Sequence, residues 1–209
     1  MRGRGVAIPG HGLHPCRSWL LGEIGFSERV LLIETQMEGT PFIAVSYHAP
    51  PGVTWGIVKP RQAVAFASWL STQNAPLLFG VDANTPLIDA FDFANTRTHL
   101  YTGRRRQQGK PGDDRLFGPC KVYDLDDALR RWLALHRDVM DRLRASKPSG
   151  PLAIPHRSGR RKDSPGNPRR FDSFWVSRHW IVRHIEHLYE EGIAAGSDHA
   201  PVMVDLDLT

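Results

Sequence analysis

Three observations predict a layered domain that combines a sheet with helices, of the α/β or α+β class. Residues 30–35 (VLLIET) and 42–47 (FIAVSY) are short apolar runs typical of buried strands, and a turn separates them. A helical pattern over 59–73 follows, and the apolar run over 77–81 predicts a third strand. Strand, helix and strand in this order is typical of a sheet with a helix packed on it.

The helix over 59–73 is predicted from its start signal and its apolar face. Pro60 suits the first turn of a helix, where its missing N–H has no intrahelical partner to lose. Ala63, Phe66, Ala67 and Leu70 recur on one side at helical spacing. This face is expected to pack on the sheet.

The second half of the chain predicts a long helix, a long loop and three more strands. The helix covers 124–144, and Asp124 can cap its N-terminus. Residues 145–170 are rich in Pro, Gly, Ser and Arg, which predicts a long basic loop. Strands are predicted over 171–176, 181–189 and 202–208. Two-residue periodicity in the second of them places His187 on one face with Ile181 and Ile185, where packing is the expected role.

Length and composition favour one globular domain that spans residues 1–209. The 209 residues are 41% hydrophobic, enough for a core, and no apolar run is long enough to cross a bilayer. The N-terminus is basic but lacks the apolar stretch of a secretory signal. Cys16 and Cys120 match no paired spacing, so we expect two separate thiols in a reducing, cytoplasmic compartment.

The charge balance favours an anionic partner. The formal net charge is +5, and much of the surplus lies in 97–110 and 156–170. One interpretation is that both segments are solvated loops whose charge only aids solubility. The other is that they contact the phosphates of a nucleic acid. Composition alone leaves both open.

Polar side chains gather where the predicted strands end or begin. His48 follows the second strand, Asp82 and Asn84 follow the third in the stretch GVDANTP, Asp172 lies in the fourth, and Asp198 and His199 precede the last. Asp, Asn and Pro also favour ordinary turns, which is the alternative for GVDANTP. Catalytic groups nevertheless collect on the loops at the ends of a sheet. The combination therefore predicts a site.

Four ordered stretches resemble the endonuclease/exonuclease/phosphatase superfamily, whose members have a deoxyribonuclease-I-like fold. GVDANTP is similar to its G-D-F/A-N element, and VSYHAPPG to the strand that ends in its first histidine. RRFDSFWVS resembles its R-x-D strand, and GSDHAPVMVDL its closing S-D-H-x-P-V element. The resemblance implies a layered α/β sandwich and a phosphoester hydrolase that uses a divalent metal, Mg²⁺ or Mn²⁺, and a water nucleophile.

The resemblance also implies a role for each polar residue. His199 would activate or orient the water and bind the scissile phosphate, and Asp172 would accept a hydrogen bond from His199. Asp198 would be a metal ligand. Asp82 and Asn84 would bind the phosphate or the water, and Asp82 would also reach the metal. His48 would assist the leaving oxygen. Hard oxygen ligands of this kind suit Mg²⁺ or Mn²⁺.

The beginning of the chain departs from the family pattern. Family members carry an Asn and a metal-binding Glu in an N-terminal part, whereas this sequence begins near the G-V-A-I strand downstream of both. The sequence therefore predicts an N-terminally truncated sandwich. Three explanations are open: the chain is a fragment, its true start lies upstream, or the protein has lost function. Two hypotheses follow: a nuclease or phosphodiesterase, or a catalytically impaired relative that binds nucleic acid or another partner.

Overall fold

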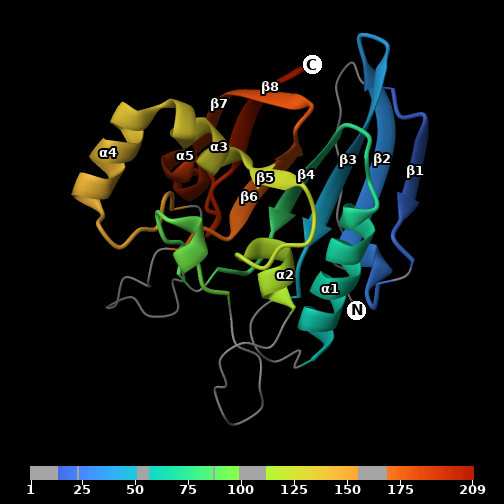
Figure 1. Cartoon of the computed structure of the whole chain (residues 1–209), viewed down its shortest axis with the longest axis horizontal. Coiled ribbons are helices and arrows are strands. Elements are labelled where there is room, and N and C mark those ends of the chain that lie inside the picture. Colours follow the sequence, from blue (N-terminus) through green and yellow to red (C-terminus); the bar gives the residue numbers. More distant parts are fainter. Residues whose placement is uncertain (1–13, 23, 51–56, 87, 99–111, 155–168) are drawn as a thin grey trace.

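The computed structural model contains two sheets and describes residues 14–22, 24–50, 57–86, 88–98, 112–154 and 169–209. Six strands form a mixed sheet in the order β1-β2-β3-β4-β6-β5, and two form a separate antiparallel pair (Figure 1). The six are β1 Arg17–Leu20, β2 Val30–Met37, β3 Thr40–His48, β4 Leu77–Asp82, β5 Leu125–Asp127 and β6 Asp172–Ser177. The pair consists of β7 Trp180–His187 and β8 Val202–Leu208. The predicted layered α/β architecture is thus confirmed.

The predicted strand–helix–strand unit is present and sets the direction of the sheet. β3 and β4 run parallel and are connected through helix α1, Val58–Ser71. The other pairings in the sheet are antiparallel, because they join strands that enter from opposite ends. In α1 the predicted apolar face is buried against the sheet, with Phe66 and Ala67 fully enclosed. The carboxyl ends of β3 and β4 therefore lie side by side.

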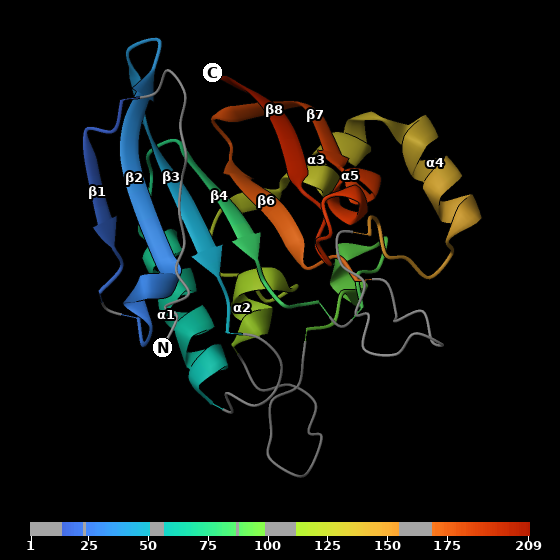
Figure 2. The same cartoon turned by 180° about the vertical axis from the view of Figure 1, so that it is seen from behind.

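Apolar side chains point alternately to the two faces of the large sheet and fill a separate core on each face. Phe79 on β4 and Trp175 on β6 stack in the core under α1 and the short helix α2, Asp113–Phe117. Their chain neighbours Leu78 and Val176 face the second core, which β7 supplies from the other side. Figure 2 shows α1 and α2 on one side of the sheet and β7 and β8 beyond β6. The large sheet is the middle layer.

The predicted single helix over 124–144 is wrong in its start and in its continuity. Residues 125–127 form strand β5, which pairs with β6, and the cap is Asp127, whose carboxylate accepts from the backbone N–H of Leu129 and Arg130. Helix α3, Ala128–Leu135, then ends at His136, and helix α4, Arg137–Ser146, begins. The backbone of His136 leaves the helical region (φ −113°, ψ 68°). The apolar stripe runs across this break.

The predicted strand over 181–189 also needs correction. β7 runs from Trp180 to His187, and helix α5, Tyr189–Ala194, takes up the residues after it. A shift in pairing between Val182 and His184 interrupts the two-residue periodicity, so Ile181 and Ile185 do not share a face. The predicted basic loop begins after α4, and its residues 155–168 lie outside the described residues, as do residues 99–110 of the other basic stretch. None of the described helices could span a bilayer.

Candidate functional site

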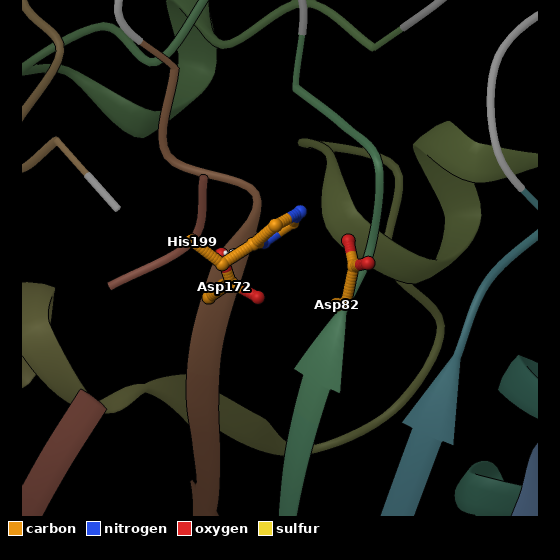
Figure 3. Close-up of side chains that lie close together, drawn as sticks. All are labelled: Asp82, Asp172 and His199. Carbon is orange, nitrogen blue, oxygen red and sulfur yellow. Dashed lines mark hydrogen bonds and ion pairs between the residues drawn. The ribbon is translucent and has the colours of Figure 1, made fainter. Parts of the chain in front are cut away.

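Strand register places three of the predicted residues in one row. His48 on β3 is the pairing partner of Asp82 on β4, and Asp82 is in turn the partner of Asp172 on β6. Paired residues project from the same face of a sheet, so these three side chains line one rim. His48 Nε2 lies 3.4 Å from Asp82 Oδ2. Figure 3 shows Asp82 and Asp172 at adjacent strand ends, with the His199 ring beside them.

His199 enters the row from the loop before β8. Its Nδ1 lies 2.8 Å from Asp172 Oδ2. Because an ionised carboxylate can only accept a hydrogen bond, Nδ1 carries the proton and donates it. Asp172 therefore fixes which ring nitrogen is protonated, and the hydrogen bond between the two residues that the resemblance implied is present.

Burial and neighbouring charge shift the pKa values of this pair in a consistent way. Burial, together with the charges of Asp82 and Asp198, raises the pKa of Asp172 to about 6 against the opposing effect of the hydrogen bond from His199. The hydrogen bond to Asp172 raises the pKa of His199 to about 9, although burial acts in the other direction. Between about pH 6 and 9 the two groups form a carboxylate–imidazolium pair.

His48 is oriented by neighbours on both sides of its ring. Arg29 Nη1 lies 3.5 Å from His48 Nδ1 and also donates to the His48 carbonyl oxygen at 3.4 Å. A guanidinium has no acceptor, so Nδ1 of His48 accepts from Arg29 and Nε2–H faces Asp82. No sequence signal pointed to Arg29, which precedes β2 by one residue.

The GVDANTP stretch is a turn as well as part of the rim. The backbone N–H of Asn84 donates to Asp82 Oδ1 at 3.1 Å, and Asn84 adopts a positive φ of 49°, which asparagine tolerates better than most residues. Its side-chain Nδ2 donates to the carbonyl of Ala49 and so connects the ends of β3 and β4. The turn interpretation therefore holds for the backbone, and the same turn carries Asp82 at the rim. Contact between Asn84 and a substrate stays a prediction.

A buried lysine beneath this turn was missed by sequence reasoning. Lys59 is 1% exposed, donates from Nζ to the Asn84 carbonyl at 3.2 Å, and lies 3.6 Å from a carboxylate oxygen of Asp113. Burial lowers its pKa, while the charges of Asp113 and Asp82 oppose the change. The signal was available, since Lys59 lies four residues before Ala63 on the apolar face of α1.

Three of the predicted residues form a group that could hold a metal ion. One ligand atom from each of Asp82, Asp172 and His199 lies within 4.8 Å of the others. Asp198 lies next to this group in the chain, and its side chain is exposed. Its charge acts on both Asp172 and His199, so it lies near them. The assignment of Asp198 as a metal ligand stays a prediction.

Comparison with known proteins shows the fold. No family model matches the sequence, and no curated protein matches it either. Among solved structures the chain is similar to D. rerio TDP2 complexed with a single-strand DNA product (9% identity, TM-score 0.59, 93% of this chain and 68% of that chain). It is also similar to an endonuclease/exonuclease/phosphatase from Bacteroides vulgatus (14% identity, TM-score 0.55, 94% of this chain and 67% of that chain). A third similar structure is the human Nocturnin catalytic domain (15% identity, TM-score 0.53, 94% of this chain and 60% of that chain).

The chain therefore has the deoxyribonuclease-I-like fold of the endonuclease/exonuclease/phosphatase superfamily. It spans about 60% of the Nocturnin domain and 68% of the TDP2 chain. Members of this superfamily are metal-dependent phosphoesterases. The donor set fits a divalent cation, because Asp82 and Asp172 offer hard oxygens and their crowded negative charges, which help to raise the pKa of Asp172, would be relieved by one.

Proposed function

We propose that this protein is a metal-dependent phosphoester hydrolase, and more specifically a nuclease or phosphodiesterase. The convergence of Asp82, Asp172 and His199 at one rim is the observation that carries the proposal. A phosphoryl group in transfer needs hydrogen-bond donors, a proton carrier and positive charge directed at one point. The rim combines two carboxylates with an oriented histidine, and a second histidine stands at its other end.

The Asp172–His199 pair is the proton-handling part of the proposed site. Asp172 holds the ring through Nδ1, so Nε2 is the atom that meets substrate or water. In its charged form His199 donates a hydrogen bond from Nε2 to a phosphate oxygen. When it has lost that proton, it accepts one from an attacking water. The carboxylate of Asp172 stabilises the imidazolium in both roles.

The other end of the rim handles the opposite side of the phosphate. Asp82 and Asp172 would hold Mg²⁺ or Mn²⁺, which when bound supplies Lewis-acid stabilisation of the phosphoryl oxygens. His48 faces Asp82 and is held by Arg29, so it assists the leaving oxygen from the side opposite to His199. Asn84 keeps Asp82 in place through its backbone N–H.

Nucleic acid is the proposed substrate class. The net charge of +5 favours a polyanion, and the chain shares its fold with a TDP2 structure that contains a single-strand DNA product. The superfamily resemblance alone would also admit nucleotides, inositol phosphates and lipids, because the same fold serves many substrates.

Hydrolysis of bis-p-nitrophenyl phosphate and of plasmid DNA in Mg²⁺ or Mn²⁺ tests the proposal. We expect turnover that chelators abolish, and a loss of about a hundredfold or more in His199→Ala and Asp172→Asn. Asp207→Asn is the matched control, since Asp207 is an exposed carboxylate on β8 paired with Arg183. Asp198→Ala tests the predicted role of Asp198 as a metal ligand. Full activity of His199→Ala would exclude the assigned site.

Binding without turnover is the second candidate function. Asp172 Oδ2 already bonds to His199 at 2.8 Å, so an ion in this group would have to share that carboxylate. A site with so few anionic ligands is expected to hold its cation weakly. DNA binding that weakens steeply with salt, with no hydrolysis at millimolar Mg²⁺ or Mn²⁺, would favour this candidate over the first.

A further inference from the structure

We propose that Arg170 is a positioning residue, which holds the turn that carries Asp82 and Asn84 against the start of β6, where Asp172 lies. The inference deepens the proposed function and rests on it for the role of Asp172. Arg170 falls in the basic stretch that the sequence assigns either to a solvated loop or to phosphate contact. The structure contradicts both for this residue, because Arg170 is 5% exposed.

The contacts of Arg170 are those of a built ion cluster. Its Nε donates to Asp89 Oδ2 at 2.7 Å and its Nη2 to Asp89 Oδ1 at 3.2 Å, the paired geometry in which a guanidinium binds a carboxylate most firmly. Nη2 also donates to the carboxylate of Asp127. Arg130 completes the set by donating to Asp89 Oδ1 at 2.6 Å. We call these four residues the Arg170 cluster.

The cluster closes the loop between β4 and residue 89. At the beginning of that loop the N–H of Ala83 donates to the carbonyl of Phe171 at 2.9 Å. At its end the carboxylate of Asp89 binds Arg170. The two ends of the loop are therefore attached to Phe171 and Arg170, the two residues directly before Asp172. The pairing of β4 with β6 sets Asp82 beside Asp172, and Arg170 holds the turn that follows Asp82 against the start of β6.

Arg170 is fixed in turn from two further directions. Asp127 caps α3, so the cluster joins the turn to a helix end. The N–H of Leu152 donates to Asp89 Oδ2 at 3.2 Å, and a Cβ on Gly150 would lie 2.3 Å from the Asp89 carbonyl oxygen, which shows how closely this segment packs. A point charge such as lysine cannot make the two parallel bonds to Asp89 and reach Asp127 as well.

The cluster also acts on the residue behind Asp172. His187 on β7 lies with Nε2 3.3 Å from the Asp172 carbonyl, to which it donates in its neutral form. Burial, with the charge of Arg170 as a smaller cause, lowers the pKa of His187 to about 4. The backbone of Asp172 is thus supported from β7 while its neighbour Arg170 is held by the cluster.

Amide hydrogen exchange tests this positioning role without any assay of activity. In the wild-type protein the amide of Ala83 should exchange far more slowly than in an unstructured peptide; free exchange would already overturn the proposal. In Arg170→Lys we expect it to exchange at least tenfold faster, while amides in the middle of β4, such as Phe79, keep their protection. A merely structural role would change both together.

Kinetics add a second readout and a matched control. Arg170→Lys and Asp89→Asn should lower kcat about tenfold with little change in KM, because the proton-handling groups are displaced and not removed. Arg183→Lys is the control, since its ion pair with Asp207 is exposed and joins β7 to β8. If Arg170→Lys leaves both Ala83 exchange and kcat unchanged, the inference is wrong. If exchange responds but the wild type hydrolyses nothing, the positioning role stands and the proposed function fails.

Discussion

One hydrogen bond sets the charge of the rim at the residue scale. The bond between His199 Nδ1 and Asp172 Oδ2 raises the pKa of His199 to about 9, so the ring is charged under ordinary conditions. His48, by contrast, is bracketed by Arg29 on one side and Asp82 on the other. The two histidines of the rim are therefore held by different partners.

The raised pKa of His199 predicts how stability changes with pH. Because the pKa is near 6.5 in the unfolded chain and about 9 in the folded one, this contribution is complete below pH 6.5 and is lost as pH rises through 9. His187 acts in the opposite direction: with its folded pKa lowered to about 4, its effect on stability rises with pH through the unfolded pKa near 6.5 and is nearly constant at higher pH. Denaturant unfolding at half-unit pH steps should show that the free energy of unfolding declines from pH 6.5 to 9, and that this decline is smaller in His199→Asn. Parallel curves for the two proteins would contradict it.

Sequence reasoning found the residues that form the rim and missed those that hold them in place. His48, Asp82, Asp172 and His199 follow from motif spelling and from their places at strand ends, and the structure brings them to one rim. The partners of a buried charge cannot be recognised from a local sequence pattern, since Arg170 and Asp89 are 81 positions apart. A buried ion cluster depends on the completed packing of several elements.

At the scale of elements, the strands that are compact apolar runs between turn residues were predicted well, whereas the short strands β1 and β5 were not predicted. β8 has the predicted bounds, and β2, β3 and β4 differ by a few residues at their ends. The helix over 124–144 failed because its apolar stripe continues across two helices that pack on the same core. Periodicity alone does not reveal a break at His136, where the ring nitrogen Nδ1 bonds to the Trp132 carbonyl.

Helix α3 offers a direct test of which stripe residues support the second core. Leu133 is fully buried there, whereas Leu135, two residues later, is 74% exposed. Leu133→Ala should lower the free energy of unfolding by about 2–5 kcal/mol. Leu135→Ala should change it by about 0.5 kcal/mol or less. Equal effects in chemical denaturation would mean that α3 presents a different face to the core.

Helix α5 controls the placement of the His199 loop through a glycine. A Cβ on Gly192 would lie 2.5 Å from the carbonyl oxygen of His199, a backbone atom that cannot rotate away. Gly192→Ala should therefore shift the loop and lower the rate of hydrolysis by roughly ten- to a hundredfold. Gly25→Ala is the control, because nothing lies within 4 Å of the added carbon. An active Gly192→Ala protein would show that the loop tolerates displacement.

At the scale of the whole molecule, the candidate site belongs to two sheets at once. Asp82 and Asp172 end or begin strands of the large sheet, while His199 precedes β8 of the small one. The two sheets meet through the second core, in which Val176 on β6 packs with Ile185 on β7. The first core, under α1, lies on the opposite face of the large sheet. Activity should therefore depend on one core more than on the other.

Two truncations of similar size separate these contributions. Ile185→Ala in the second core and Leu70→Ala in the first remove buried side chains that are 4% and 1% exposed, so each should cost about 2–5 kcal/mol of unfolding free energy. Only Ile185→Ala loosens the small sheet, whose His187 supports Asp172 and whose β8 follows His199. We expect it to lower kcat severalfold at a temperature where both proteins remain folded, while Leu70→Ala keeps the wild-type value. Equal losses of kcat would mean that the rim depends on global stability and not on the seating of the small sheet.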